Sequence, residues 1–594
     1  MLPTLTRRTM TMLLGATALS GIARAAAAAS GADARFADIV KTWLEAYLSL
    51  QPIGATQTGD HRFDVEIDDM SATGRMARLK AWQAALTALA ALDRSKLARD
   101  NQVDAAILDS QLRYAVWDET VFQSWAWDPQ VYSNLAGNAI YGLMARDFAP
   151  LPDRMRATIA RMEKLPALFA QARENLVPAR VPLVHAQTVA KQNGGVSELV
   201  DSMVLVHADA LSADEQKRLA AAADALKKAV AAHQDWLDKI LVPGAKGDFR
   251  IGAKLFDEKL AFTLNSPMSR KDIRDRAEAA VKKTRADMYD VSLKALAQHG
   301  TPAVVPNVIT PEHEQQTIEA ALALAYAQKP ARDKVVETAK AALERATLYV
   351  RDKDLITLPT APVEVVLMPE FARGVAVAYC DSPGPLDKGM KTYFDVSPIP
   401  DDWTDEQAAS FLREYNSLGI QDIAVHEAMP GHYVQLWHAN ACPSVLRAVL
   451  SSGSFVEGWA VYAEGMMVEK GFLGDDPLYR LTQLKVLLRT ITNSILDQAL
   501  HVDGISRDDA MKLMTVTAFQ QEREAAGKWI RASLSSTQLS TYFVGVSEHN
   551  SIRAEAERRA GGAFDLKTYH DKVLSYGSAP ARYVRALMFG EAIG

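Results

Sequence analysis

The sequence has few cysteines and, after its first thirty residues, no long apolar run. Cys380 and Cys442 are the two cysteines among 594 residues, which excludes a disulfide framework and a cysteine-based zinc cluster. Whether these two residues pair with each other is left open by the sequence. No later segment is long and apolar enough to cross a bilayer, so we expect a mature form without a stable membrane span.

Excess positive charge is also lacking. The 66 basic residues face 72 acidic ones, which gives a formal net charge of -6 and no basic footprint for nucleic acid. No G-x-S-x-G segment occurs, which argues against a Ser-His-Asp hydrolase. Hydrophobic residues at 48% and charged residues at 23% are typical of a folded globular protein rather than a disordered one.

The first 29 residues have the pattern of an export signal. The Arg7-Arg8 pair precedes an apolar run over residues 10–22, and Ala23-Arg24-Ala25 fits a cleavage site. The paired arginines indicate the twin-arginine route. We therefore expect a periplasmic or secreted protein; the alternative is a signal that is retained as an N-terminal membrane anchor.

Helix signals dominate the rest of the chain. Ser212, Ser269 and Thr404 open capping-box patterns, and Thr310-Pro311 is a helix start with proline in the first turn. Apolar residues follow helical spacing over 73–92, 99–116, 153–176 and 484–502. These patterns predict a mainly α protein. We expect one helical body over 30–594, with an N-terminal part at about 30–350 and a metal-site part at about 351–594.

The pattern changes between residues 355 and 397. Four short segments there are rich in β-branched or aromatic residues and bounded by proline or glycine. They are residues 356–358, 363–368, 375–379 and 392–396. The sequence therefore predicts a small sheet of three or four strands just before the motif described next.

The segment His426-Glu427-Ala428-Met429-Pro430-Gly431-His432 carries most of the chemical information. The H-E-x-x-H motif of zinc peptidases places two histidines four residues apart on one helix face, with the glutamate as general base. Here the histidines are six residues apart, so on an ideal helix their side chains would point about 120° apart. Proline and glycine before His432 predict a bulge or break that could bring it back toward His426.

A third metal ligand is expected downstream. Glu457 and Glu464 lie seven residues apart in the segment FVEGWAVYAE, so both occupy one face of an otherwise apolar helix. Glu457 is the predicted ligand, and His438 is a rival for that place. Glu464 is predicted to orient a ligating imidazole, with a buried salt bridge as the alternative.

The segments HEAMPGH and EGWAVYAE resemble a bacterial family known as domain of unknown function 885. That family looks like a branch of the thermolysin-related zinc peptidases, the gluzincins. The resemblance implies a large helical zincin-like fold that binds one Zn²⁺. It implies His426, His432 and Glu457 as zinc ligands and Glu427 as the general base.

Two further segments are similar to family patterns. Asp497 and His501 lie in a D-x-G-x-H-like segment, and Tyr542 lies in an A-Y-x-x-G-like one. The resemblance suggests His501 and Tyr542 as residues that stabilise the oxyanion, with Asp497 supporting His501; the alternative is that all three are structural. It also places the segment ending at Tyr379 where gluzincins have the edge strand that binds an extended peptide, so Tyr379 is a candidate substrate contact.

The expected function is an exported zinc peptidase that acts on a peptide substrate. Two alternatives remain open from the sequence. One is a metal- or peptide-binding protein without turnover, and the other is a metal-dependent esterase or amidase.

Overall fold

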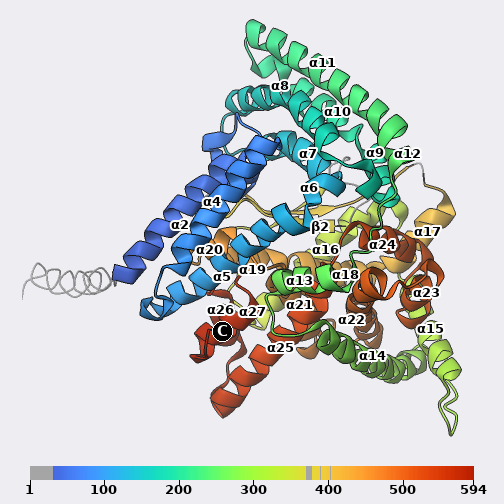
Figure 1. The fold of residues 1–594 in the computed structure, drawn as a ribbon. Helices are drawn as coiled ribbons and strands as arrows, with labels where there is room; N and C mark the ends of the chain where they lie inside the picture. The colour runs from blue at the N-terminus through green and yellow to red at the C-terminus, as the bar shows by residue number, and fades with distance from the viewer. Residues whose placement is uncertain (1–30, 369–377, 388, 402, 594) are drawn as a thin grey trace, which may run out of the picture.

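The computed structural model describes residues 31–368, 378–387, 389–401 and 403–593, and most of them are helical (Figure 1). The signal segment lies outside the described residues. The first half contains α2 (Gly31–Leu50), α3 (Pro52–Thr58), α4 (Ala72–Ala90), α5 (Arg99–Trp117), α6 (Ser124–Trp127), α7 (Gln130–Met144), α8 (Leu151–Asn175), α9 (Leu183–Gln192), α10 (Gly195–Leu199), α11 (Ala213–Trp236), α12 (Val242–Gly244), α13 (Gly252–Leu264) and α14 (Arg270–Gln298). The second half contains α15 (Pro311–Ala327), α16 (Val335–Asp352), α17 (Asp405–Glu414), α18 (Ser417–Glu427), α19 (His432–Ala439), α20 (Val445–Val449), α21 (Gly453–Glu469), α22 (Pro477–Gln498), α23 (Arg507–Lys512), α24 (Glu522–Leu534), α25 (Ser540–Ala560), α26 (Leu566–Leu574) and α27 (Ala581–Phe589).

The predicted helix starts are found where the sequence places them. The side chains of Ser212, Ser269 and Thr404 each accept a hydrogen bond from the backbone N–H of the third helical residue. The side chain of that third residue in turn accepts a hydrogen bond from the backbone N–H of the capping residue. Each pairing satisfies two backbone N–H groups that a helix end leaves without partners. The mainly α fold class is thereby confirmed.

The sheet has three strands in the order β1-β3-β2. They are β1 (Glu364–Leu367), β2 (Ala378–Asp381) and β3 (Tyr393–Val396). Strand β3 pairs parallel with β1 and antiparallel with β2, which leaves β2 at an edge among the strands that the structure describes. The predicted strand at 356–358 is wrong, because those residues form no ladder. Residues 375–377 of the predicted third segment lie outside the described residues.

The described residues form two large apolar cores. One is built from residues 53–241, mainly α7, α8 and α11, which form the upper group of helices in Figure 1. The other gathers the sheet with residues of α14 to α19, α21, α22 and α25 to α27. Helices α14 to α16 thus share a core with helices of the metal-site half of the chain, and α13 packs in a smaller core with α14, α22 and α25. Cys380 and Cys442 are both free thiols.

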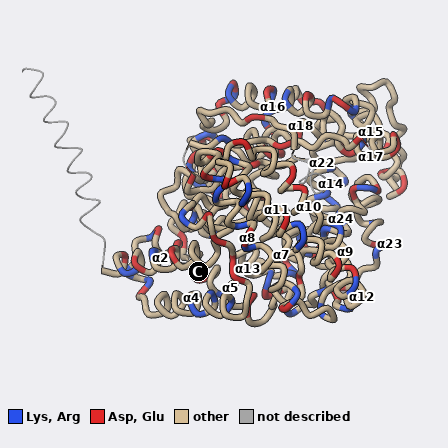
Figure 2. The backbone as a smooth tube through the Cα atoms, turned by 90° about the horizontal axis from the view of Figure 1, so that it is seen from above, with Lys and Arg blue, Asp and Glu red and all other residues tan. Residues whose placement is uncertain are grey.

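Charges of both signs are mixed along the chain. Figure 2 shows Lys and Arg interspersed with Asp and Glu over the helices, which agrees with the near balance in composition. None of the helices in the described ranges has the length and apolarity of a membrane span.

Helices α21 and α25 cross at a pair of glycines. A Cβ added to Gly545 would lie 2.0 Å from the carbonyl oxygen of Ser454 and 2.7 Å from the Cα of Gly458. One turn further along, His549 Nε2 lies 2.9 Å from the carbonyl oxygen of Phe455. Helix α21 carries Glu457. This close approach therefore fixes the position of Glu457 relative to α25.

The Gly545→Ala variant should therefore be destabilised by about 1–3 kcal/mol, because the added methyl group overpacks the crossing. Gly527→Ala in α24 is the matched control, since a Cβ there meets nothing within 4 Å; it should be neutral or stabilising by up to about 1 kcal/mol. Denaturant unfolding measures both, and equal stabilities would contradict the close-packed crossing.

The connection between β2 and β3 is tied to the N-terminal half. His61 Nδ1 lies 2.9 Å from Asp64 Oδ2 and His61 Nε2 lies 3.1 Å from Asp387 Oδ1. The Leu386 N–H also donates to the Thr58 carbonyl at 2.9 Å. Burial works to lower the pKa of His61, but the two carboxylates outweigh it and raise that pKa to about 9.

This tie should make stability depend on pH. Since the pKa of His61 is raised above its unfolded value near 6.5, its stabilising contribution is complete below that pH and is lost as pH rises toward about 9. We expect the difference in unfolding free energy between the wild type and His61→Gln to shrink over that interval. A difference that stays constant with pH would contradict the ion pair.

Candidate metal centre

The helix that carries His426 ends directly after it. Helix α18 stops at Glu427, and α19 begins at His432. Pro430 has no N–H to continue the helical ladder, and it disfavours helical angles at Met429. The Met429–Pro430 peptide bond is cis. The motif is therefore a helix–break–helix segment rather than one continuous helix.

Gly431 holds the break against the last turn of α18. Its N–H donates to the carbonyl of Val425 at 2.9 Å, and a Cβ at this position would lie 1.8 Å from the carbonyl oxygen of His426. Only glycine allows the backbone to approach so closely. His432 consequently lies beside His426, with ring centroids 4.8 Å apart and ring planes at 87°.

Glu457 reaches the two imidazoles from α21. Its Oε2 atom lies 3.6 Å from His426 Nε2 and 3.5 Å from His432 Nε2. All three ligand atoms lie within 4.8 Å of one another. In a tetrahedral zinc site with bonds of 2.0–2.2 Å, ligand atoms are about 3.3–3.6 Å apart. The donor set of two nitrogens and one carboxylate oxygen fits zinc in both chemistry and spacing.

Glu464 lies behind His426 on the same helix as Glu457. Its Oε1 atom is 2.6 Å from His426 Nδ1, and its side chain is 1% exposed. A carboxylate at this position fixes the ring orientation and leaves Nε2 free to bind a metal.

Charges in the centre stabilise one another. Burial works to raise the pKa of Glu457, but the two imidazoles outweigh it and hold that pKa well below its usual range. Burial likewise works to lower the pKa of His426, and contacts with Glu457 and Glu464 raise it well above its usual value. A cation placed between these groups would meet a carboxylate that is already ionised.

Glu427 is held next to the cluster by the edge strand. Its Oε2 atom accepts a hydrogen bond from the backbone N–H of Cys380 in β2 at 3.1 Å. Burial raises the pKa of Glu427, and the neighbouring imidazoles oppose that effect. A carboxylate with a raised pKa is well suited to accept and return a proton.

Comparisons with known proteins agree over nearly the whole chain. Residues 52–588 match the model of the family described as bacterial protein of unknown function (DUF885). The chain belongs to the DUF885 family. No curated protein matches it.

Two solved structures resemble this DUF885 protein. A "putative lipoprotein of unknown function" from Shewanella oneidensis is 34% identical, with a TM-score of 0.78, and the match covers 94% of this chain and 100% of that one. A "putative lipoprotein" from Colwellia psychrerythraea is 16% identical, with a TM-score of 0.74 and coverage of 93% and 98%. The second likeness shows the fold alone.

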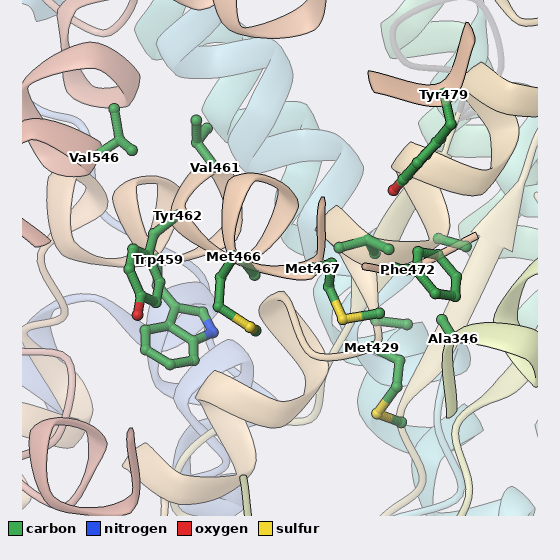
Figure 3. Packing of buried hydrophobic residues seen from close by; sticks show 14 of the residues in the cluster. Ala346, Met429, Trp459, Val461, Tyr462, Met466, Met467, Phe472, Tyr479 and Val546 are labelled. Carbon is green, nitrogen blue, oxygen red and sulfur yellow. The ribbon is translucent and has the colours of Figure 1, made fainter. Parts of the chain in front are cut away.

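Sequence reasoning missed two groups that hold the DUF885 centre together. Trp459 is fully buried, and its indole N–H donates to the carbonyl of Pro430 at 2.9 Å. It belongs to the same apolar cluster as Met429, Met466 and Met467, as Figure 3 shows. The one signal for Trp459 in the sequence was its position, two residues after the predicted ligand Glu457. The Cys380 contact is made by the backbone, so residue type gave no signal for it.

His501 does not join the centre. The ring is 2% exposed; Nδ1 faces the carbonyl of Phe249 at 3.2 Å, and Nε2 faces those of Ala532 at 2.9 Å and Ser535 at 2.7 Å. Because both ring edges face backbone carbonyls, no donor is left for an oxyanion. The structure therefore gives no support to the catalytic expectation for His501.

Asp497 likewise supports the backbone rather than His501. It accepts hydrogen bonds from the N–H groups of Thr537 at 2.9 Å and Ser540 at 3.1 Å. These contacts fix the start of α25, which carries Tyr542. The Tyr542 hydroxyl accepts from Arg531 at 3.1 Å and Gln538 at 3.3 Å, so its own hydrogen remains available to donate.

His438, the rival ligand, and Tyr379, the candidate substrate contact, interact with groups outside the three-residue cluster. His438 Nε2 is 2.8 Å from the carbonyl oxygen of Thr357, and His438 is not in the three-residue cluster. Tyr379 interacts with Tyr141 of α7, and burial raises its pKa well above the usual range. Its side chain therefore interacts with the N-terminal half.

Removing the support of His426 should weaken metal binding. Glu464→Gln should lower zinc affinity about 10–100-fold, because the ring loses a charged acceptor that orients it and raises its basicity. Competition with a chromophoric chelator measures this. Glu337→Gln, an exposed glutamate paired with Lys334, is the control. Unchanged affinity in Glu464→Gln would remove Glu464 from the metal centre.

Proposed function

We propose that this DUF885 protein is an exported zinc-dependent peptidase with a gluzincin-like centre. The observation that carries the proposal is the convergence of His426, His432 and Glu457 beside the carboxylate of Glu427, with Glu457 at a tetrahedral-edge distance from both imidazoles. A ligand set of three residues that leaves one position open is typical of catalytic rather than structural zinc.

Bound zinc would supply a water of lowered pKa and would polarise the scissile carbonyl. Glu427 takes the proton from the attacking water and returns it to the leaving amine. The Cys380 N–H holds one Glu427 oxygen at 3.1 Å, which leaves the other oxygen for this transfer. Tyr542, whose hydrogen is free, is the proposed donor to the oxyanion.

The sheet provides a place for the substrate backbone. Strand β2 lies at the edge of the sheet and contacts Glu427 through Cys380. An extended peptide that adds to such an edge is bound through its main chain, and its scissile bond would lie next to the base. This arrangement favours a peptide substrate over a small ester.

Export is part of the proposal. The paired arginines and apolar run of the first 29 residues support it. The two similar structures come from proteins described as "putative" lipoproteins, and lipoproteins are an exported class.

Glu427→Gln should bind zinc as the wild type does and should lose peptide hydrolysis by about 10²–10⁴-fold, because the general base is gone. The measurement is mass-spectrometric profiling of products from a mixed peptide library, with zinc content determined in parallel. Glu337→Gln serves as the control again, since its carboxylate is exposed.

Wild-type activity in Glu427→Gln would end the general-base assignment. A wild-type protein that binds zinc stoichiometrically but cleaves no peptide would favour the binding-protein alternative.

A further inference from the structure

A second cluster of charges lies between α17, α22 and α24. It contains three cations, Lys485, Arg489 and Lys528, and two carboxylates, Glu414 and Glu524. Lys485 is paired, with its Nζ 2.8 Å from Glu414 Oε2. Glu464 adds a further negative charge to the field at Arg489, so the cluster is distinguished by how far two of its cations lie from their partners and not by an excess of charge. A buried polar group without a hydrogen-bond partner is costly.

Arg489 and Lys528 have no close partner. The Arg489 guanidinium is 3.8 Å from Glu524 and 4.0 Å from Glu414, and the Lys528 ammonium is 3.8 Å from Glu524. Within the part of the chain that the structure describes, no hydrogen bond reaches either cation; Glu524 Oε2 instead accepts from the Tyr415 hydroxyl at 3.0 Å. Both cations therefore keep unused donors.

The surroundings of these donors suit an anion. Burial, reinforced by Arg489 and by Arg531, lowers the pKa of Lys528 to about 7, while Glu524 and Glu414 oppose that effect. The Arg489 side chain remains 24% exposed and that of Glu524 26%, so the cluster opens to solvent. An entering anion would give both cations the close partner that they lack.

The cluster lies along the helix that carries the metal centre. Glu414 comes three residues before α18, whereas His426 lies at its end. Helix α22, which carries Arg489, packs against both α18 and α21. Eleven residues of helix span on the order of 15 Å, and an extended chain covers about 3.3–3.6 Å per residue. About four extended peptide residues would therefore cover the length of α18.

We propose that Arg489 and Lys528 bind the free C-terminal carboxylate of the peptide substrate. The protein would then release short C-terminal fragments instead of cutting within long chains. This inference rests on the proposed peptidase function. Arginine presents a planar fork that matches a carboxylate, and loss of such a charge-assisted contact weakens binding about 10–100-fold.

The test compares an N-acetylated alanine hexapeptide with the same peptide as a C-terminal amide. Binding to zinc-loaded Glu427→Gln is measured by calorimetry, which needs no turnover. We expect the free acid to bind about 10–100-fold more tightly than the amide. Equal affinities, or no binding of either peptide, would overturn the inference.

Variants then locate the contact. Arg489→Gln and Lys528→Gln, each made in the Glu427→Gln protein, should lose most of the preference for acid over amide while retaining affinity for the amide. Lys271→Gln, which removes a lysine that is 81% exposed, should keep the preference. A preference that survives in both variants would overturn the assignment of these residues, and thermal unfolding midpoints together with Arg489→Lys check that the fold is retained.

Turnover separates this inference from the proposed function. Wild-type enzyme should cut the free acid at a fixed distance from its C-terminus. Equal cleavage of acid and amide would leave the peptidase standing and remove the carboxylate site. Preferential binding of the acid without any cleavage would keep the carboxylate site and contradict the peptidase.

Discussion

The candidate metal centre depends on the interruption of one helix. Pro430 cannot continue α18, and Gly431 is the residue type that tolerates a backbone atom 1.8 Å from where a Cβ would be. The break allows two histidines six positions apart to share one space. The buried indole of Trp459 in α21 donates a hydrogen bond to the Pro430 carbonyl within the break. The glycine crossing of α21 with α25 fixes the position of Glu457 relative to α25.

Several charged or hydrogen-bonding groups surround this break. Glu457 faces both imidazoles, Glu464 supports His426 from behind, and the Cys380 N–H holds Glu427. The edge strand therefore serves both the base and the substrate backbone in the proposed function. Strand β2 is in turn tied to the N-terminal half through its connection to β3 and His61, so helices distant in sequence stabilise the same site.

Much of the fold could be predicted because helix ends are local events. The boxes at Ser212, Ser269 and Thr404 need only neighbours three residues away. The three-residue cluster could be anticipated because proline and glycine restrict the backbone in known ways. His501 could not, since its partners are carbonyls far away in sequence, and a motif likeness does not show which way a ring faces. The cations near Glu524 lie on two different helices, and their lack of partners is visible only in three dimensions.

The central claim is that His426, His432 and Glu457 surround one metal ion. Its most direct test is anomalous diffraction at the zinc edge from crystals grown with zinc. We expect a single strong peak bonded to His426 Nε2, His432 Nε2 and a Glu457 oxygen at about 2.0–2.2 Å. A peak bound elsewhere, or these three side chains pointing apart with no peak between them, would contradict it.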